Sequence, residues 1–385
     1  MTVQTHGCEL GQCRRLRAIV DLAAIAENTR SLQKAAAMDG HKPELMAIVK
    51  ADGYGHGAIP VAKAALAAGA TWLGVALPTE GVVLRKAGIT APILVLGAFA
   101  PACAHYYYEW QLTATLATLP GLAGLLTAAA AGRRIPVHLK VDTGMTRLGF
   151  LPDEAVRIAM QAKQGGVYLQ GVYTHLATAD AEDTTFALQQ LTLFRQTLHA
   201  LKGQGIDLPW RHAGNSAAIM QLALTMEEMN LVRAGIALYG LAPSPHLTRV
   251  LDLRPAMTLE TEVVAVRHLP QGASVGYGAT YKTSSDTTIV VLPVGYADGY
   301  TRRMSHRAAV LIQGRRYPVV GSICMDQCMV DMGRQEIAIG TPVVLMGKQG
   351  DEEITADDWA AWSGTINYEI VCGISRRVPR WYTSV

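Results

Sequence analysis

The stretch MAIVKADGYGHGAIPVAKAALAAGATWLGVAL, residues 46–77, holds two short apolar runs separated by an Ala-rich segment. Met46–Lys50 and Trp72–Leu77 have the composition and length of strands, whereas Ile59–Ala68 has helical character. The order is therefore strand, helix, strand. Whether the order repeats along the chain decides the fold class.

The order does repeat through the first two thirds of the chain. Eight runs have strand character: Met46–Lys50, Trp72–Leu77, Ile93–Gly97, Thr113–Ala117, Val137–Asp142, Leu169–Leu176, Trp210–Asn215 and Leu231–Leu238. Helical segments such as Asp153–Lys163 and Thr184–Lys202 separate them. Eight alternations of strand and helix predict an α/β fold, a (β/α)₈ TIM-like barrel, with a doubly wound open sheet as the alternative.

The pattern changes near Arg254. Strand-like runs then follow one another without helical spacers, at Met257–Val266, Thr288–Pro293, Ala309–Ile312, Val319–Ser322 and Pro342–Met346. Two prolines interrupt the periodicity within residues 242–249, so this segment is the expected linker. We predict a barrel over residues 17–248 and a smaller, mostly β domain over 249–385. Residues 1–16 are expected to form an edge strand of the β domain or to stay disordered.

The composition excludes several classes of protein. Half of the 385 residues are hydrophobic and 17% are charged, which excludes a disordered chain. The 34 Lys and Arg residues barely exceed the 31 Asp and Glu residues and are scattered, so we expect no nucleic-acid partner. Apolar runs such as 121–132 fall short of the ~18 residues that cross a bilayer, and no export signal is seen, so no membrane partner is expected.

The cysteines point to a reduced, cytoplasmic setting. No pair has C-x-x-C spacing, and no His/Asp cluster has the spacing of metal ligands, so no metal is expected. The six cysteines are Cys8, Cys13, Cys103, Cys324, Cys328 and Cys372. The chain also has 14 Tyr against 4 Phe, and a hydroxyl can bond, donate or titrate where Phe cannot. Some of these tyrosines are therefore candidates for chemistry.

Polar residues gather where the predicted barrel strands end, which is where barrel enzymes carry their active sites. These residues are Lys50, Lys140, Asp142, His175, Asn215 and Arg233. Lys50 alone has two interpretations: a surface lysine whose stem is buried, or an amine with a lowered pKa, as Schiff-base lysines need. Lys140 and Asp142 are either a structural pair or part of a site in which Arg147 faces an anion. The glycines after Lys50 do not match the dinucleotide-binding spacing.

Seven motifs, in order along the chain, resemble the alanine racemase family. They are Val49–Gly57, Lys140–Gly149, Tyr173–Asp180, His212–Ser216, Val232–Ile236, Gly295–Gly299 and Cys324–Gln327. The resemblance covers the chain from about Arg17 to Tyr382. It implies a pyridoxal 5'-phosphate enzyme with an N-terminal barrel and a C-terminal β domain. It also implies a homodimer with shared active sites.

The resemblance assigns two catalytic residues. Lys50 matches the lysine that holds the cofactor and acts as one base, and Tyr277 matches the opposing base, which the partner subunit supplies. Racemisation removes the Cα proton from one face and returns one to the other, so two bases on opposite faces suit the reaction. The implied product, D-alanine, would feed bacterial cell-wall peptidoglycan precursors.

The resemblance also assigns binding residues. The cofactor positions are Lys50, Tyr54, Arg147, His175, Asn215, Ser216, Arg233, Gly235, Ile236 and Tyr368. Arg233 matches the arginine at the pyridine nitrogen, and His175 and His212 match the histidines that support it. Arg147 is expected near cofactor and substrate, and Tyr296 and Met325 of the partner subunit at the substrate mouth. Lys140 matches a lysine often N-carboxylated in relatives.

Alternatives remain open. A racemase of the same fold could prefer serine, because a pocket discriminates poorly against one added hydroxyl. A sister decarboxylase would lack the two-base pair, and a non-catalytic pyridoxal-phosphate carrier would have no use for the β domain. Thr146 stands where relatives often have Gly, and Gly214 where a larger residue is common. These departures put loop geometry and substrate breadth in question rather than the reaction.

Overall fold

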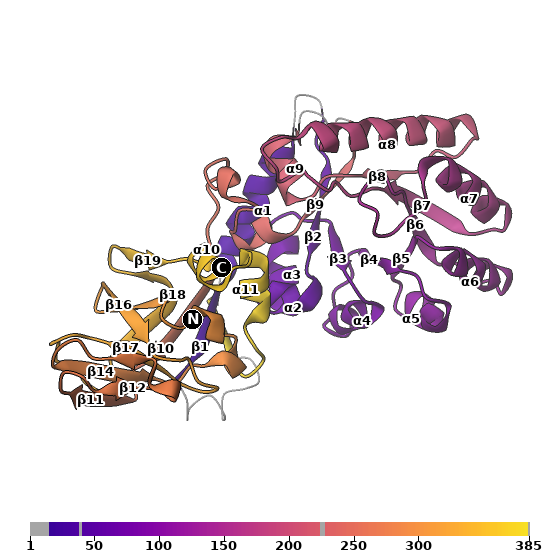
Figure 1. The fold of residues 1–385 in the computed structure, drawn as a ribbon. Helices are drawn as coiled ribbons and strands as arrows, with labels where there is room; N and C mark the ends of the chain where they lie inside the picture. Colours follow the sequence, from indigo (N-terminus) through magenta and orange to yellow (C-terminus); the bar gives the residue numbers. More distant parts are fainter. Residues whose placement is uncertain (1–14, 38–40, 224–227, 384–385) are drawn as a thin grey trace. The chain divides into compact units, whose positions relative to one another are not determined.

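The computed structural model describes residues 15–37, 41–223 and 228–383 (Figure 1). These residues form two compact units. One comprises residues 24–53 and Ala58–Arg254, and the other comprises residues up to Ala23, Tyr54–Gly57 and the chain from Pro255 onward. Residues 1–14 of the predicted N-terminal extension lie outside the described residues. The division of the chain at residues 248 and 249 stays a proposal.

The first unit is the predicted barrel. Its strands are β2 (Glu44–Ile48), β3 (Trp72–Val75), β4 (Ile93–Ala98), β5 (Thr113–Leu116), β6 (Pro136–Lys140), β7 (Tyr168–Tyr173), β8 (Trp210–His212) and β9 (Leu231–Ala234). The order β8-β7-β6-β5-β4-β3-β2-β9 is parallel throughout. Backbone hydrogen bonds from Asn230 to Arg211 and from Arg233 to Gly214 bring β9 beside β8. The open-sheet alternative is therefore wrong.

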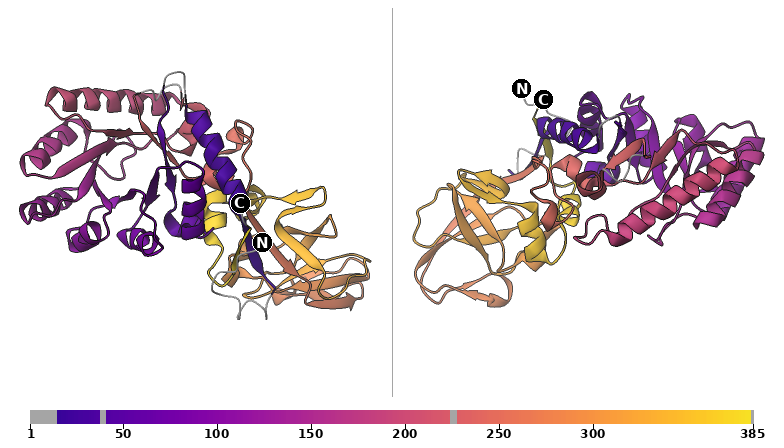
Figure 2. Two further views of the ribbon diagram at one scale, coloured as in Figure 1. Left: turned by 180° about the vertical axis from the view of Figure 1, so that it is seen from behind. Right: turned by 90° about the horizontal axis from the view of Figure 1, so that it is seen from above.

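Helices cover the outside of the strands (Figures 1 and 2). They are α1 (Leu22–Ala36), α3 (Ala58–Ala67), α4 (Pro78–Lys86), α5 (Ala104–Glu109), α6 (Leu119–Ala130), α7 (Pro152–Gln164), α8 (Thr185–Gly203) and α9 (Ser216–Gln221). Strands β3 and β5 are buried along their whole length, as expected when side chains fill the barrel on one face and helices pack on the other. The segment α2 (Lys50–Tyr54) differs, because Ala51, Asp52 and Gly53 have left-handed backbone angles.

The second unit is mostly β, as predicted. Its main sheet runs β11-β14-β17-β16-β15-β18-β10-β1-β20, with β19 paired to β18. The strands are β1 (Arg17–Asp21), β10 (Met257–Glu262), β11 (Ala265–Leu269), β12 (Ser274–Val275), β13 (Tyr281–Lys282), β14 (Thr287–Leu292), β15 (Ala309–Ile312), β16 (Arg315–Val320), β17 (Cys328–Asp331), β18 (Pro342–Gln349), β19 (Glu352–Ile354) and β20 (Arg380–Thr383). Strand β1 pairs with β10 and β20, so the two ends of the described chain share one sheet.

Two details of the β unit differ from the sequence prediction. Met257–Val266 is not one strand, because β10 ends at Glu262 and pairs with β1 and β18, whereas β11 pairs with β14. Two helices, α10 (Ala356–Ser363) and α11 (Asn367–Gly373), lie in a region predicted without helices. Thr355 starts α10 as an N-cap that accepts a hydrogen bond from the Asp358 backbone N–H, a signal that the periodicity analysis overlooked.

Candidate active site

The barrel strands bring the predicted polar residues onto neighbouring elements. Lys50 lies two residues after the end of β2, and Arg233 lies in β9, which pairs with β2 so that Met46 and Arg233 are register partners. Lys140 ends β6, and His175 follows β7. These positions agree with the rule that barrel sites are built at the carboxyl ends of strands.

Arg233 is the buried centre of this arrangement, with 4% of its surface exposed. Nη1 donates to Nδ1 of His212 over 2.8 Å, and Nη2 donates to Nδ1 of His175 over 3.1 Å. Nη2 also donates to the carbonyl oxygens of Thr174 and Ala213, at 2.9 and 2.8 Å. Burial lowers the pKa of Arg233 to about 10, so the guanidinium keeps its charge at neutral pH. No described residue accepts from Nε, which leaves this N–H for a ligand.

A pair of buried histidines continues the network behind Arg233. A guanidinium can only donate, so Nδ1 of His212 accepts, and its Nε2–H then donates to Nδ1 of His138 over 2.8 Å. Burial, followed by the charge of Arg233, lowers the pKa of His138 to about 3 and that of His212 well below its ordinary value. The same two causes lower the pKa of His175. All three imidazoles are neutral; Arg233 orients His175 and His212, and His212 in turn orients His138.

Lys140 and Tyr173 occupy the same interior. The Lys140 ammonium nitrogen lies 4.4 Å from the centre of the Tyr173 ring, and that ring stacks on His212 at 4.6 Å. Lys140 is 7% exposed. Burial, with the nearby charges of Arg233 and Arg147, lowers the pKa of Lys140 well below its usual range. The Lys140 amine therefore loses its proton more easily than an exposed lysine does.

Asp142 does not form the ion pair with Lys140 that one interpretation required. In the described chain, its carboxylate accepts from the backbone N–H groups of Gly144 and Thr146, at 2.9 and 3.0 Å. Asp142 therefore shapes the loop that carries exposed Arg147. Thr146 has a φ of 52°, a left-handed value that favours glycine. The departure from Gly at this position is thus accommodated with some backbone strain.

A cluster of neutral donors lies where β9 ends. The backbone N–H groups of Gly235 and Ala237 donate to Oγ of Ser216, over 2.8 and 3.3 Å, so the Ser216 hydroxyl proton can point to a ligand. Gly235 precedes a 3₁₀ turn over Ile236–Tyr239, and Asn215 caps α9 by accepting from the Ala218 N–H. A hydroxyl and backbone N–H groups at the starts of two short helical turns suit an anion such as a phosphate ester.

The two tyrosines expected at the phosphate lie together in the second unit. The ring centres of Tyr54 and Tyr368 are 6.3 Å apart. Tyr54 is buried, and burial, with Tyr368 nearby, raises the pKa of its hydroxyl. This hydroxyl is therefore a neutral donor at any physiological pH.

The residues expected to act on a partner subunit are exposed in the β unit. Tyr277 is 70% exposed, Met325 52% and Tyr296 42%. Tyr277 follows Gly276, which has a φ of 75°, a left-handed value that favours glycine. In the described chain, no residue hydrogen-bonds the Tyr277 hydroxyl. Large side chains that are exposed on one subunit are suited to an interface with another.

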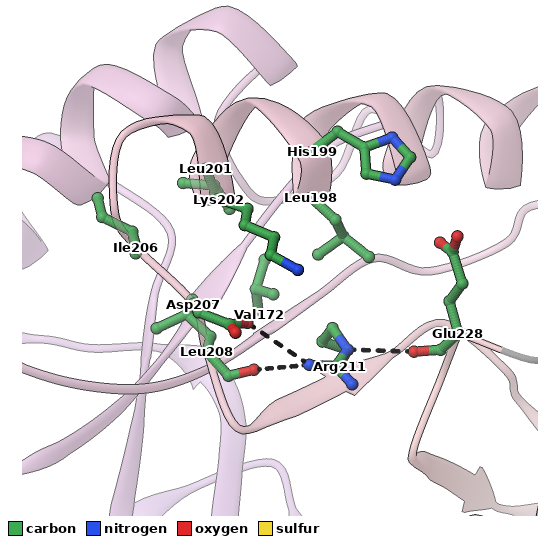
Figure 3. Close-up of a pocket in the computed structure, with 10 residues that line it drawn as sticks. All are labelled: Val172, Leu198, His199, Leu201, Lys202, Ile206, Asp207, Leu208, Arg211 and Glu228. Atoms are coloured by element: carbon green, nitrogen blue, oxygen red, sulfur yellow. Dashed lines mark hydrogen bonds and ion pairs between the residues drawn. The ribbon is translucent and has the colours of Figure 1, made fainter.

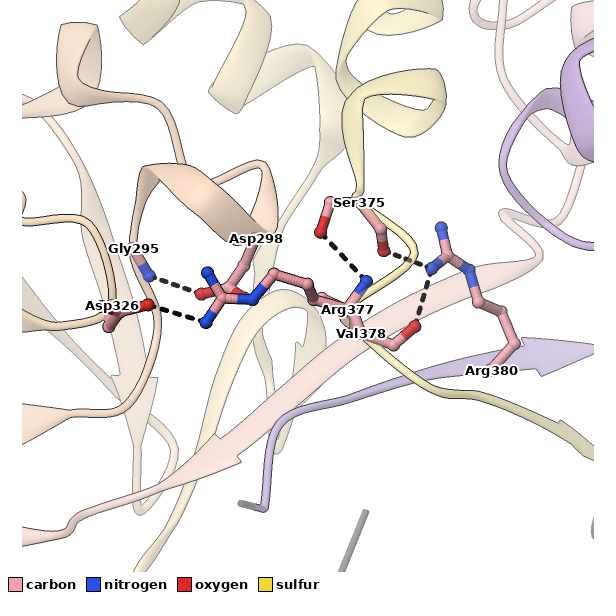
Figure 4. A network of polar contacts seen from close by, with 7 residues as sticks. All are labelled: Gly295, Asp298, Asp326, Ser375, Arg377, Val378 and Arg380. Atoms are coloured by element: carbon pink, nitrogen blue, oxygen red, sulfur yellow. Dashed lines mark hydrogen bonds and ion pairs between the residues drawn. The ribbon is translucent and has the colours of Figure 1, made fainter. Parts of the chain in front are cut away.

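The loops that carry Tyr296 and Met325 are tied to each other. The backbone N of Tyr296 donates to the Cys324 carbonyl over 3.0 Å, and that of Ala297 donates to Met325 over 3.1 Å. Figure 4 shows Arg377 joining both loops, with Nη2 2.7 Å from Asp326 Oδ1 and Nε 3.6 Å from Asp298 Oδ1. The two loops that carry these side chains are thus held together.

A cavity elsewhere in the barrel unit has no relation to the predicted site (Figure 3). Its volume is about 320 Å³, and it lies between α8 and β8, lined by residues such as His199, Lys202, Asp207 and Arg211. Arg211 is held there by the carbonyls of Leu208 and Glu228. None of the predicted site residues lines this cavity.

Comparisons with known proteins agree with the geometry. The family model "Alanine racemase, N-terminal domain" matches residues 20–243, and "Alanine racemase, C-terminal domain" matches residues 256–382. This chain belongs to the alanine racemase family. It is an isomerase by family, as predicted, and has the family's barrel and β domain.

Individual relatives match almost the whole length of this family member. The alanine racemase of Symbiobacterium thermophilum is 48% identical over 377 residues, covering 97% of this chain and 98% of that protein. The Desulfovibrio desulfuricans alanine racemase is 44% identical over 373 residues, covering 96% of this chain and 98% of the relative. The crystal structure of the E. faecalis alanine racemase has a TM-score of 0.90 at 37% identity, covering 97% of this chain and 99% of that one.

The sequence analysis missed three residues of this racemase-family site. His138 lies two positions before Lys140 on β6, so strand alternation alone would have placed it inside the barrel. Tyr173 stands within one of the seven motifs but received no role. Glu80, which accepts from the backbone N–H of Ala51, gave no signal in the sequence.

Other features of the family member can be stated for the described residues. No helix among them is long and apolar enough to span a membrane. They contain no group of three or more His, Cys, Asp or Glu side chains able to hold a metal ion. Their cysteines form no disulfide, and Cys8 and Cys13 lie outside the described chain.

Proposed function

We propose that the protein interconverts L-alanine and D-alanine with pyridoxal 5'-phosphate, in the cytoplasm. One observation carries the proposal: a buried guanidinium with an unused N–H, a lysine in the turn after the adjacent strand, and a neutral anion site at Ser216 belong to one barrel unit. The names of the relatives support the substrate. The product would feed peptidoglycan precursors.

The donor set fits the cofactor. Pyridoxal phosphate has an aldehyde that reacts with an amine, a pyridine nitrogen that accepts a hydrogen bond, and a phosphate. Lys50 would take the aldehyde, and Arg233 Nε–H would donate to the pyridine nitrogen. Ser216, the backbone of Gly235 and Ile236, Tyr54 and Tyr368 would hold the phosphate. The remaining cofactor residues in this proposal are Arg147, His175 and Asn215.

The residues of the chain would then carry the proton transfers. The bound cofactor withdraws electrons from the substrate Cα and so acidifies its proton. The Lys50 amine takes or returns the proton on one face, and Tyr277 of the partner subunit does so on the other. Arg233 can only donate, so it favours an unprotonated pyridine nitrogen and a weaker electron sink, which limits transamination.

Lys140 and Arg147 form a second part of the proposal. A neutral, buried Lys140 amine can add to carbon dioxide and lose a proton, which would convert it to a carbamate anion beside Arg147. The negative charge of the carbamate would then offset the positive charge of Arg147 and hold Arg147 near the substrate. Nuclear magnetic resonance with ¹³C-labelled carbon dioxide checks this: a carbamate signal absent from Lys140→Ala is expected.

We also propose a homodimer with shared sites, because Tyr277, Tyr296 and Met325 are exposed. Lys50→Ala and Tyr277→Phe subunits, each inactive, are mixed and allowed to exchange. Half of the dimers become mixed, and each mixed dimer holds one intact site of two, so about one quarter of wild-type activity should return. Absence of rescue despite demonstrated exchange would refute the shared site.

The main test is an absorbance spectrum before and after borohydride, with racemisation of L-alanine and L-serine measured in parallel. We expect a visible band that borohydride abolishes and that Lys50→Ala lacks, with alanine turned over faster than serine. A coloured protein that prefers serine would keep the mechanism and change the substrate. A coloured protein without turnover would be a carrier, and a protein that cannot bind the cofactor would refute the proposal.

A further inference from the structure

The chain has an unusual backbone directly after Lys50. Ala51, Asp52 and Gly53 have φ values of 51°, 53° and 62° and ψ values of 49°, 48° and 46°, which is a left-handed turn. L-residues disfavour this region, and two of the three are not glycine. Such strain persists only where surrounding contacts impose it, and it tends to mark functional positions.

Glu80, the third residue of α4, supplies one of these contacts. Its Oε1 accepts from the backbone N–H of Ala51 over 2.7 Å. Its Oε2 accepts from Ala76 at 2.7 Å and from Leu77 at 3.0 Å. One carboxylate therefore ties the turn after β2 to the loop after β3, and charge-assisted bonds of this kind are strong.

Two further hydrogen bonds stabilise the turn, and both join residues close to it in the sequence. The Gly53 N–H donates to the Val49 carbonyl over 2.9 Å, and Asp52 Oδ1 accepts from the Ala58 N–H over 2.9 Å. Neither bond fixes the peptide plane between residues 50 and 51. Glu80 does, because it binds the N–H of that peptide.

We propose that Glu80 is a positioning residue for Lys50: its carboxylate holds the left-handed turn and thereby sets the direction of the Lys50 side chain. The inference rests on the proposed function in one respect, namely that Lys50 is the reactive amine. The clamp itself concerns only the chain's own backbone.

Glu80→Gln tests the clamp, with Glu109→Gln as the matched control, because Glu109 is an exposed residue at the end of α5. The amide nitrogen cannot accept, so at least one side of the clamp is lost. We expect kcat to fall on the order of tenfold with KM nearly unchanged, as for loss of a charge-assisted hydrogen bond. Hydrogen exchange on the full-length protein should quicken in the peptide containing Ala51. The control should change neither quantity.

Ala51→Gly distinguishes positioning from a merely structural role. Glycine adopts the left-handed region without penalty, so the turn then needs less support. In the Glu80→Gln background, Ala51→Gly should restore most of the lost kcat, while Ala51→Gly alone should change kcat less than twofold. A loss that glycine does not rescue would mean that Glu80 serves only the loop at Ala76 and Leu77, and would overturn the proposal.

The two proposals fail separately. An inactive wild-type protein would refute the racemase, yet exchange at Ala51 would still report the clamp. An active wild type with an unaltered Glu80→Gln variant would refute the clamp alone. If Glu80→Gln does not fold, Glu80→Asp keeps the charge but is too short to bind both loops, and a wild-type kcat in that variant would equally overturn the clamp.

Discussion

The barrel end around Arg233 and the β unit around Tyr277 hold the two halves of the proposed chemistry in opposite ways. Arg233 is 4% exposed and donates to four partners, whereas Tyr277 is 70% exposed and its hydroxyl has no described partner. The Nη1 and Nη2 atoms of Arg233 are bonded inside their own chain, whereas, within the described residues, the Tyr277 hydroxyl is not. A change at Arg233 should therefore alter both the stability and the activity of the protein, whereas a change at Tyr277 should alter the activity alone.

Tyr277→Phe tests this difference with the largest expected effect. Loss of a general acid or base lowers kcat on the order of 10³-fold. Because the side chain is exposed, thermal unfolding should be unchanged. Tyr281→Phe is the matched control, since its hydroxyl donates to Asp331 within the same unit, and it should keep kcat while losing stability. Equal kcat values for the two variants would contradict the role of Tyr277.

Arg233→Met should lower both kcat and the stability of the fold. Four acceptors lose their donor in a buried place, so the free energy of unfolding should fall by about 3 kcal/mol. Urea unfolding measures this. Arg316→Met, which removes an exposed pair with Glu352 at 2.7 Å, should cost less than about 1 kcal/mol. Similar losses for both arginines would show that the barrel network carries no special stability.

The buried histidines give a pH dependence of smaller size. The folded pKa of His138, about 3, lies below the unfolded value, so only the unfolded chain binds a proton as the pH falls below about 6.5. Stability is therefore fully present above that pH and is lost on acidification, by about 2 kcal/mol from pH 6.5 to 5 for this histidine. His138→Asn should flatten the slope between these pH values. A slope that His138→Asn leaves unchanged would contradict this origin of the pH dependence.

Tyr173→Phe should have the smallest effect. The Thr115 hydroxyl donates to the Val95 carbonyl over 2.7 Å and so accepts from the Tyr173 hydroxyl, at 3.0 Å. The variant loses this bond but keeps the ring on His212, so unfolding should cost about 1 kcal/mol less. A loss beyond about 3 kcal/mol would mean that the hydroxyl, and not only the ring, supports the network around Arg233.

Much of the barrel could be predicted because its information is local. Each strand carries its own apolar run and each helix its own periodicity, so all eight strands were placed within a few residues. The β unit was predicted less well. Strands β10 and β11 were predicted as one strand. No residue near Glu262 indicates that the pairing partner changes from β18 to β14. Helices α10 and α11 were missed because they are short and lie among strands.

The sequence by itself determined the fold class, the family and the identity of the polar residues at the strand ends, because periodicity and motif spacing are written in consecutive residues. Only the tertiary structure decided how these residues act on one another. It showed that Arg233 fixes the tautomers of His175 and His212, that Asp142 binds the backbone of a loop and forms no ion pair with Lys140, and that Glu80 binds the turn after Lys50. Such contacts join residues distant in the chain, and a hydrogen bond depends on distance and direction in space, which residue order does not encode.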